Sequence, residues 1–288
     1  MPATHRERLA KVLTSAKVLT SAILVSALLV SAMLASSLAA GAAVRSDRPP
    51  SSAKVMPPNS ARNWYFIPKG AHARPGIPAS AGRLLRRYSG VWAGDRHERV
   101  IYLTFDEGYE NHTTWRIIGI LKRAHVKASF FLTGQYMRAN PKLTRSLAGH
   151  GDLVCSHSNT HPSMVDKARS VGAFTAQFRA TERAYHAATG GDIARFFRPP
   201  YGIYSARTLY LTQRLGYTTV FWSFAYVDWV LADQPPVSVT LARILSASHP
   251  GAIYLLHAAS PSNTAALAAA IRGLKRQGYG FATLDELP

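Results

Sequence analysis

From about residue 62 to its end, the chain alternates between short apolar runs and longer segments with helical spacing of apolar residues. The short runs are rich in Val, Ile, Phe and Tyr and have the length of buried strands. Seven such runs occur, at 100–105, 127–133, 152–156, 194–198, 219–224, 252–257 and 280–284. The pattern therefore predicts a sheet of about seven strands.

Segments of helical periodicity fill the intervals, at 113–124, 141–150, 171–189, 206–215, 239–248 and 263–277. Several are followed by a glycine that would cap a helix, namely Gly190, Gly216 and Gly278. Strands that alternate with helices favour parallel pairing through helical crossovers. We therefore expect the α/β class, with one barrel of about seven parallel strands in place of two separate domains.

The N-terminal part has a different composition. Residues 18–44 carry no charged side chain, follow a basic start and include Ala40-Gly41-Ala42, an A-x-A cleavage pattern. The run is also long enough to span a bilayer. We predict an export signal or an N-terminal membrane anchor in residues 1–44, a Pro- and Ser-rich linker in 45–61, and the folded domain in 62–288.

The net charge of the chain restricts the classes of partner that it is expected to bind. Lys and Arg number 34 against 15 Asp and Glu, a formal net charge of +19, while 47% of the residues are hydrophobic. This composition is that of a globular protein with an anionic partner. Because the leader predicts export, an anionic cell-wall polymer or membrane surface is expected, and nucleic acid is not. The sequence leaves the oligomeric state open.

Ionisable residues stand at the ends of five of the predicted strands. They are Asp106-Glu107, His157 with His161, Arg198, Asp228 and His257. In parallel β/α folds the carboxyl ends of the strands meet on one face, where ligands bind and chemistry takes place. The pattern predicts a shared site at the mouth of the barrel.

His157 and His161 are four positions apart, so one helical turn would place them on the same side. Together with a carboxylate from the first strand they form a candidate three-ligand metal site with open positions. Such a metal polarises a carbonyl and activates water. Hydrolysis also needs a base and an acid, for which Asp106 and His257 are the candidates.

Each of these residues also has an ordinary structural interpretation. Two histidines at this spacing can arise by chance in a chain with 11 of them. Asp106 could cap a helix, His257 could be a satisfied core histidine, and Arg198 could be a surface cation. Beside the acids, Arg198 would instead keep the carboxylates ionised and oriented. We favour the metal interpretation because these residues occur together at successive strand ends.

The motifs, in this order, resemble those of the polysaccharide deacetylase family, carbohydrate esterases that remove N- or O-acetyl groups. They are Thr104-Phe105-Asp106-Glu107, His157-Ser158-Asn159-Thr160-His161-Pro162, Arg198-Pro199-Pro200-Tyr201, Asp228-Trp229 and Leu255-Leu256-His257. The resemblance spans residues 62 to 287 and makes 62–288 a deacetylase catalytic domain. It implies a distorted (β/α) barrel with fewer than eight strands.

Longer stretches resemble the branch of the family that acts on N-acetylmuramic acid, the delta-lactam-biosynthetic de-N-acetylases. Among them are "LTFDEGYEN", "RPPYGIYSARTLYLTQRLGY" and "HPGAIYLLHAAS". The resemblance implies that the substrate is peptidoglycan glycan and that the product closes to muramic lactam in spore cortex. It also implies a divalent metal ion, for which zinc is the leading candidate.

The same resemblance assigns roles to individual residues. Asp106 is the base, His257 the acid, and His157 and His161 the metal ligands. Leu255 lines the acetate pocket, and the backbone N–H of Tyr201 stabilises the oxyanion. Pro200 and Trp229 complete the substrate-binding surface.

Two positions depart from the family pattern. Glu107 stands where most members have a metal-binding Asp, so it can ligate, ligate through water or not ligate, and we predict weaker metal affinity. Ala225 replaces an acid that tunes the catalytic histidine in many relatives, and Asp228 is the candidate substitute. Two alternative functions stay open: a de-N-acetylase of N-acetylglucosamine in peptidoglycan or chitin-like glycans, and a non-catalytic, basic protein that binds cell-wall glycan.

Overall fold

The computed structural model describes residues 55–288. The predicted export signal or anchor, and residues 45–54 of the predicted linker, lie outside the described residues. Within residues 55–288, none of the helices has both the length and the hydrophobicity needed to cross a membrane.

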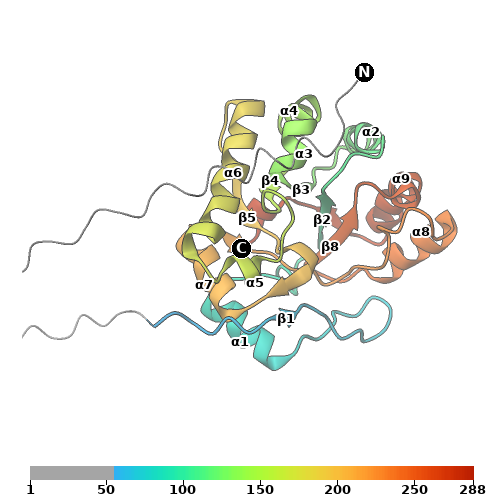
Figure 1. Ribbon diagram of the computed structural model, residues 1–288. Coiled ribbons are helices and arrows are strands. Elements are labelled where there is room, and N and C mark those ends of the chain that lie inside the picture. Colours follow the sequence, from blue (N-terminus) through green and yellow to red (C-terminus); the bar gives the residue numbers. More distant parts are fainter. Residues whose placement is uncertain (1–54) are drawn as a thin grey trace, which may run out of the picture. The chain divides into compact units, whose positions relative to one another are not determined.

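The centre of the fold is a curled, seven-stranded sheet in which every pair of strands is parallel (Figure 1). Its strand order is β7-β5-β4-β3-β2-β8, and β9 also pairs with β2. The strands are β2 (Val100–Glu107), β3 (Ser129–Leu132), β4 (Leu153–Ser156), β5 (Ala194–Phe197), β7 (Thr218–Thr219), β8 (Ala252–His257) and β9 (Gly280–Phe281). The seven predicted strands and their parallel pairing are thus confirmed.

Residues 220–224 bring the two edges of the sheet together. The N–H of Val220 still donates to Phe197 on β5, at 2.8 Å, and the N–H of Ser223 donates to Ile253 on β8, at 3.0 Å. The predicted strand 219–224 is therefore a short strand plus a segment that bends across to β8. This segment turns the curled sheet into a distorted barrel, as predicted.

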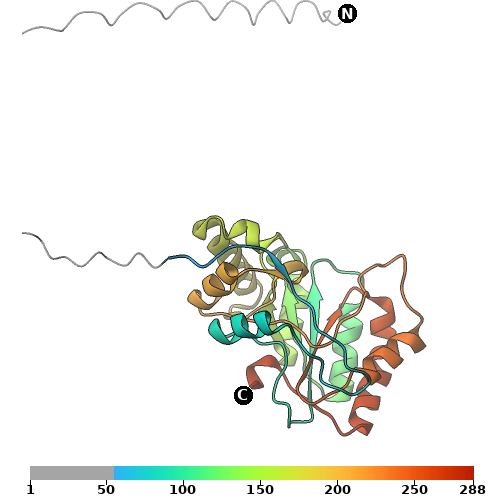
Figure 2. The same ribbon diagram turned by 90° about the horizontal axis from the view of Figure 1, so that it is seen from below.

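Helices surround the barrel, and the termini of most of them match the sequence pattern (Figures 1 and 2). The predicted helices are α2 (Thr114–Ala124), α4 (Pro141–His150), α6 (Val171–Thr189), α7 (Ala206–Arg214), α8 (Val237–Ser246) and α9 (Pro261–Arg276). Three short helices were not predicted, namely α1 (Ala79–Arg87), α3 (Gly134–Ala139) and α5 (Met164–Lys167). The four and six residues of α5 and α3 give too few turns for a periodic signal, whereas α1 is as long as the predicted α7 and was overlooked.

Alternation along β2 separates two cores. Tyr102 packs with the interior cluster that includes Phe131 and Ile253, whereas Phe105 packs in the larger cluster shared with the helices. Because successive side chains of a strand point to opposite faces, Asp106 shares the interior face with Tyr102. Glu107 shares the helix-facing side with Phe105.

The N-terminal segment covers the closing segment 220–224. Trp64 stacks on Phe221 with ring centroids 4.3 Å apart, and its indole N–H donates to the carbonyl of Trp222 at 3.0 Å. Strand β1 (Arg62–Asn63) pairs antiparallel with β6 (Ile203–Tyr204). In the stretch predicted to be linker, the carbonyl of Pro58 accepts the N–H of Arg207 at 3.0 Å, so this end of the stretch contacts the domain.

Candidate active site

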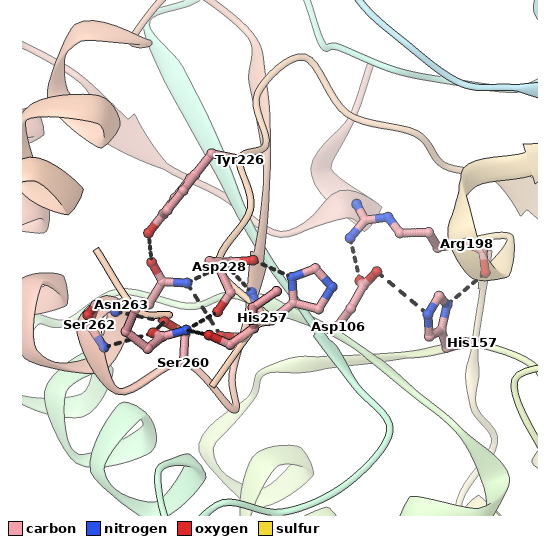
Figure 3. Close-up of polar contacts among 11 residues, drawn as sticks. Asp106, His157, Arg198, Tyr226, Asp228, His257, Ser260, Ser262 and Asn263 are labelled. Carbon is pink, nitrogen blue, oxygen red and sulfur yellow. Dashed lines mark hydrogen bonds and ion pairs between the residues drawn. The ribbon is translucent and has the colours of Figure 1, made fainter. Parts of the chain in front are cut away.

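Asp106 lies at the centre of the site, buried at the carboxyl end of β2. Its Oδ1 is 2.6 Å from Nη1 of Arg198, and its Oδ2 is 3.6 Å from Nε2 of His157 (Figure 3). Burial alone would raise the pKa of Asp106, but the charge and hydrogen bond of Arg198, together with the nearby His157 and His257, outweigh it and the pKa is lowered. Asp106 is therefore an ionised carboxylate inside the barrel, the state that a general base requires.

Arg198 follows β5 and is completely buried, so it is no surface cation. Its guanidinium lies over the ring of Phe131, 4.0 Å from the centroid. A cation removed from water in this way needs a carboxylate partner, and Asp106 is that partner. The pair holds the Asp106 side chain in one orientation toward His157.

His157 and His161 meet on the other side of Asp106, with their Nε2 atoms 3.1 Å apart. The expectation of a helical turn between them is wrong. Residues 157–161 form a loop in which Ser158 and His161 have positive φ angles of 66° and 58°. The hydroxyl of Ser158 accepts the N–H of His161 at 3.0 Å, which closes the loop and brings the imidazoles together.

The ring of His157 is oriented by the chain itself. Its Nδ1 is 2.8 Å from the backbone carbonyl of Arg198, so Nδ1 carries the proton and Nε2 presents a lone pair. Burial lowers the pKa of His157 to about 4, and burial also lowers the pKa of His161. Both rings are neutral near pH 7, which is the form that binds a metal.

Contacts from two helices fix the histidine loop. The side-chain oxygen of Gln177, on α6, accepts the N–H groups of Asn159 and Thr160 at 3.0 and 3.3 Å. At the start of α3, the N–H of Gly134 donates to the carbonyl of Ser158 at 3.0 Å. A Cβ at position 134 would lie 2.5 Å from the side-chain oxygen of Asn159 and 3.2 Å from Cα of Thr181, so a larger residue would force the Asn159 side chain to move.

His257 ends β8 and faces the same space from the opposite side, between Asp228 and Asp106 (Figure 3). Its Nδ1 is 2.6 Å from Oδ1 of Asp228, and its backbone N–H donates to Oδ2 at 2.8 Å. Burial lowers the pKa of His257, but the hydrogen bond and the charge of Asp228 outweigh it, so the pKa is raised. Asp228 thus supplies the acid that is missing at Ala225.

Glu107 has other partners. Its carboxyl accepts the hydroxyl of Thr114 at 3.1 Å, and Glu110 shares that hydroxyl. Within residues 55–288, Glu107 has no hydrogen bond or ion pair with His157 or His161. Burial raises its pKa to about 8, so near pH 7 it is largely a neutral acid on the helix-facing side of β2. Its role as a metal ligand stays a prediction.

The residues assigned to substrate binding surround these groups. The Tyr201 side chain is 66% exposed, has its ring centroid 4.5 Å from that of His161, and donates its hydroxyl to the His161 carbonyl at 3.2 Å. Trp229 is about half exposed, with its ring centroid 5.2 Å from that of His257. Pro200, next to Tyr201 in the sequence, and Leu255, two residues before His257, are buried. Two exposed aromatic rings therefore lie beside His161 and His257, next to the buried Asp106.

The two histidines fit a divalent metal. Their Nε2 atoms converge, the tautomer of His157 is fixed by a carbonyl, and an ionised carboxylate lies beside them. Imidazole nitrogen is a preferred donor for zinc and similar ions. No group of three or more His, Cys, Asp or Glu residues in 55–288 is arranged as a complete ligand set. The chain itself thus provides a pair of nitrogen donors with the remaining positions open.

Three residues that position this site were not found from the sequence: Gln177, Asn263 and Tyr226. Asn263 donates to Asp228, and the Tyr226 hydroxyl donates to Asn263. Asn263 stands at the start of the predicted helix 263–277, where it would be interpreted as a cap, so the sequence does not indicate its role. Gln177 gives no signal in the sequence either.

Comparisons with known proteins identify the family of the chain. Residues 93–220 match the family model described as polysaccharide deacetylase. The peptidoglycan-N-acetylmuramic acid deacetylase PdaA of Bacillus subtilis is 36% identical over 230 residues, covering 80% of this chain and 87% of that protein. Its structure, of a family 4 carbohydrate esterase, superposes with a TM-score of 0.77 at 36% identity, covering 80% of this chain and 97% of that one.

Two other relatives extend the comparison. A peptidoglycan-N-acetylglucosamine deacetylase of Listeria monocytogenes is 32% identical, covering 65% of this chain and 38% of that protein. A family 4 pseudoenzyme of Bacillus anthracis has a TM-score of 0.63 at 32% identity, covering 69% of this chain and 68% of that one. Together with the barrel, these matches define a carbohydrate esterase. The chain belongs to the polysaccharide deacetylase family, carbohydrate esterase family 4.

Proposed function

We propose that the protein is a metal-dependent de-N-acetylase of N-acetylmuramic acid in peptidoglycan. The observation that carries the proposal is the arrangement of Asp106 and His257. One is an ionised carboxylate beside two convergent imidazoles, and the other is a histidine paired with a buried carboxylate on the opposite side. This is the pair of a base and an acid that amide hydrolysis requires.

The residues divide the reaction between them. His157 and His161 would hold a divalent ion, with zinc as the leading candidate, which when bound polarises the acetyl carbonyl and activates water. Asp106 takes a proton from the attacking water. The backbone N–H of Tyr201 stabilises the oxyanion, and His257 donates a proton to the departing amine nitrogen. The products are acetate and a free amine on the sugar.

The choice of sugar rests on the relatives. PdaA, named for N-acetylmuramic acid, is more similar over a larger part of the chain than the relative named for N-acetylglucosamine. Once the stem peptide is gone, a free amine on muramic acid can attack the lactyl carboxyl of the same sugar and close a delta-lactam with loss of water, as in spore cortex. We therefore infer a role in the sporulating cell wall.

Location and retention form part of the proposal. The uncharged stretch at 18–44 supports export, with cleavage or anchoring left to experiment. The surplus of positive charge supports retention on anionic wall polymer or membrane. Retention of this kind is screened by salt, so binding that survives high salt would contradict it.

The experiment incubates metal-stripped protein, with and without added zinc, with glycan strands that carry or lack stem peptides. Mass spectrometry then locates the loss of acetyl groups. Zinc-dependent loss of acetyl groups from muramic acid supports the proposal. Loss of acetyl groups from glucosamine would support the same reaction with N-acetylglucosamine as the substrate. Tight glycan binding without acetyl loss, under any divalent metal, would identify a non-catalytic binding protein like the pseudoenzyme relative.

A further inference from the structure

Behind His257 lies a chain of polar contacts in which two members, Tyr226 and Asn263, belong to none of the family motifs (Figure 3). Asp228 is fully buried, and its Oδ2 accepts both the backbone N–H of His257 and the side-chain amide of Asn263. The carbonyl oxygen of the Asn263 amide accepts the hydroxyl of Tyr226. The order of contacts is Tyr226, Asn263, Asp228 and His257.

The chemistry of the contacts fixes the orientation of the Asn263 amide. An asparagine presents an NH₂ donor on one side and a carbonyl acceptor on the other. A carboxylate accepts only, so the NH₂ group must face Asp228 and the carbonyl must face Tyr226. The reverse orientation would place two acceptors against each other in a buried site.

The Asn263 side chain is not used for the capping of α9. The Ser260 hydroxyl caps that helix by accepting the backbone N–H of Asn263, at 3.1 Å. Asn263 is 1% exposed, and a polar side chain buried to this extent is costly unless it is hydrogen-bonded. Its contacts all lead to Asp228, His257 and Tyr226.

We propose that Asn263 and Tyr226 are positioning residues of the catalytic acid. The amide of Asn263, itself held by Tyr226, occupies Oδ2 of Asp228 and thereby directs Oδ1 to Nδ1 of His257. Without this contact the carboxylate can rotate, and His257 loses the fixed tautomer that leaves Nε2 toward the substrate. The inference deepens the proposed deacetylase function and rests on it.

The test compares Asn263→Ala and Tyr226→Phe with two control variants in the full chain. Thr264→Val removes a buried hydroxyl of α9 that donates to Ser260 at 3.0 Å. Tyr254→Phe removes a buried tyrosine hydroxyl that donates to Ile244 at 2.9 Å. Neither control contacts Asp228 or His257, so each reports the cost of losing a buried hydrogen bond alone.

Deacetylation kinetics give the first readout. A hydrogen bond to a buried carboxylate that acts in the transition state predicts a fall in kcat of about tenfold to hundredfold for Asn263→Ala, with KM nearly unchanged. Tyr226→Phe is expected to lower kcat less, by about threefold to tenfold. The controls keep wild-type kcat. Wild-type kcat in Tyr226→Phe, or an equal loss in the controls, would overturn the inference.

Proton NMR gives a second readout that needs neither substrate nor metal. The Nδ1 proton of His257, shared with Asp228, should resonate at low field in the wild type and in both controls. It is assigned by its loss in His257→Gln. We expect it to weaken or move upfield in both test variants, and an unchanged resonance would overturn the inference. Inactive wild-type protein would refute the proposed function and leave this readout intact.

Discussion

Arg198 and Asp106 form an ion pair inside the barrel, with Nη1 and Oδ1 2.6 Å apart and Arg198 wholly buried. Within residues 55–288, the second terminal nitrogen of Arg198, Nη2, has no hydrogen-bond partner. Its Nε donates to the carbonyl of Val220 at 3.4 Å, so among residues 55–288 Asp106 is the one carboxylate that pairs with the guanidinium. A buried cation is costly. Because the fold places Arg198 beside Asp106, the fold itself keeps Asp106 ionised.

Arg198→Met tests this dependence by replacing the cation with a neutral side chain. Removing one partner of a buried ion pair costs about 3–5 kcal/mol of the free energy of unfolding. The pKa of Asp106 is lowered in the native protein, so the pair stabilises above the ordinary pKa and the gain is lost as the pH falls. The variant should therefore be most destabilised near pH 7 and less so in acid. Urea unfolding near pH 7 and in acid measures the difference in free energy of unfolding between the variant and the wild type. An equal difference at the two pH values would contradict the account.

Glu107→Gln tests the buried acid that follows Asp106 in the sequence. Since burial raises its pKa from 4.5 to about 8, the folded protein binds this proton more tightly than the unfolded chain. The free energy of unfolding should fall as the pH rises between these two values, and Glu107→Gln should remove that fall. Thermal unfolding of metal-free protein across this range provides the measurement.

The same variant decides whether Glu107 is a metal ligand. Its contacts are with Thr114, so we expect Glu107→Gln to keep the zinc affinity of the wild type and His161→Ala to lose it. A large loss of zinc affinity in Glu107→Gln would show ligation. Glu107→Asp tests the prediction that Glu107 makes the metal affinity weaker than the Asp of most family members would. Zinc affinity that stays unchanged in Glu107→Asp would reject this prediction.

Gln177→Ala tests the support of the histidine loop. The side-chain oxygen of Gln177 accepts two backbone N–H groups of the loop, and groups that orient metal ligands commonly change metal affinity by about tenfold to a hundredfold. We expect zinc affinity to fall about tenfold. Gln213→Ala on α7 removes a side-chain hydrogen bond to Ser89, outside the loop, and serves as the control. Equal zinc affinity in the two variants would refute the role of Gln177.

The fold was predictable because it depends on local periodicity and on the rule that parallel strands end on one face. From that rule alone, Asp106, Arg198 and His257 could be predicted to lie close together. The bend after Thr219 was not predictable, because "TVFWSF" contains no glycine, proline or charged residue to mark a break, and only its pairing with two different strands divides it. The apolar pattern of a strand does not show with which other strands it pairs.

The details of the site depended on contacts between distant segments. The histidine loop has left-handed residues at Ser158 and His161 that no spacing rule anticipates. Asn263 reaches Asp228 across 35 residues of sequence, and Gln177 reaches Asn159 across 18. Alternation along β2 could have shown that Asp106 and Glu107 point to opposite faces, since adjacent residues of a strand do so. Motif matching treats the two acids as one unit.

The most direct test of the central claim measures acetate release from N-acetylated glycan by the wild type, Asp106→Asn, His257→Gln and the double variant, each loaded with zinc. If the two residues are base and acid of one reaction, each single change should lower kcat by about a hundredfold to ten-thousandfold. The double variant should be little worse than the poorer single variant, because residues that act as a unit are not additive. Either single variant keeping more than about a tenth of wild-type kcat, while folded and metal-loaded, would contradict the account.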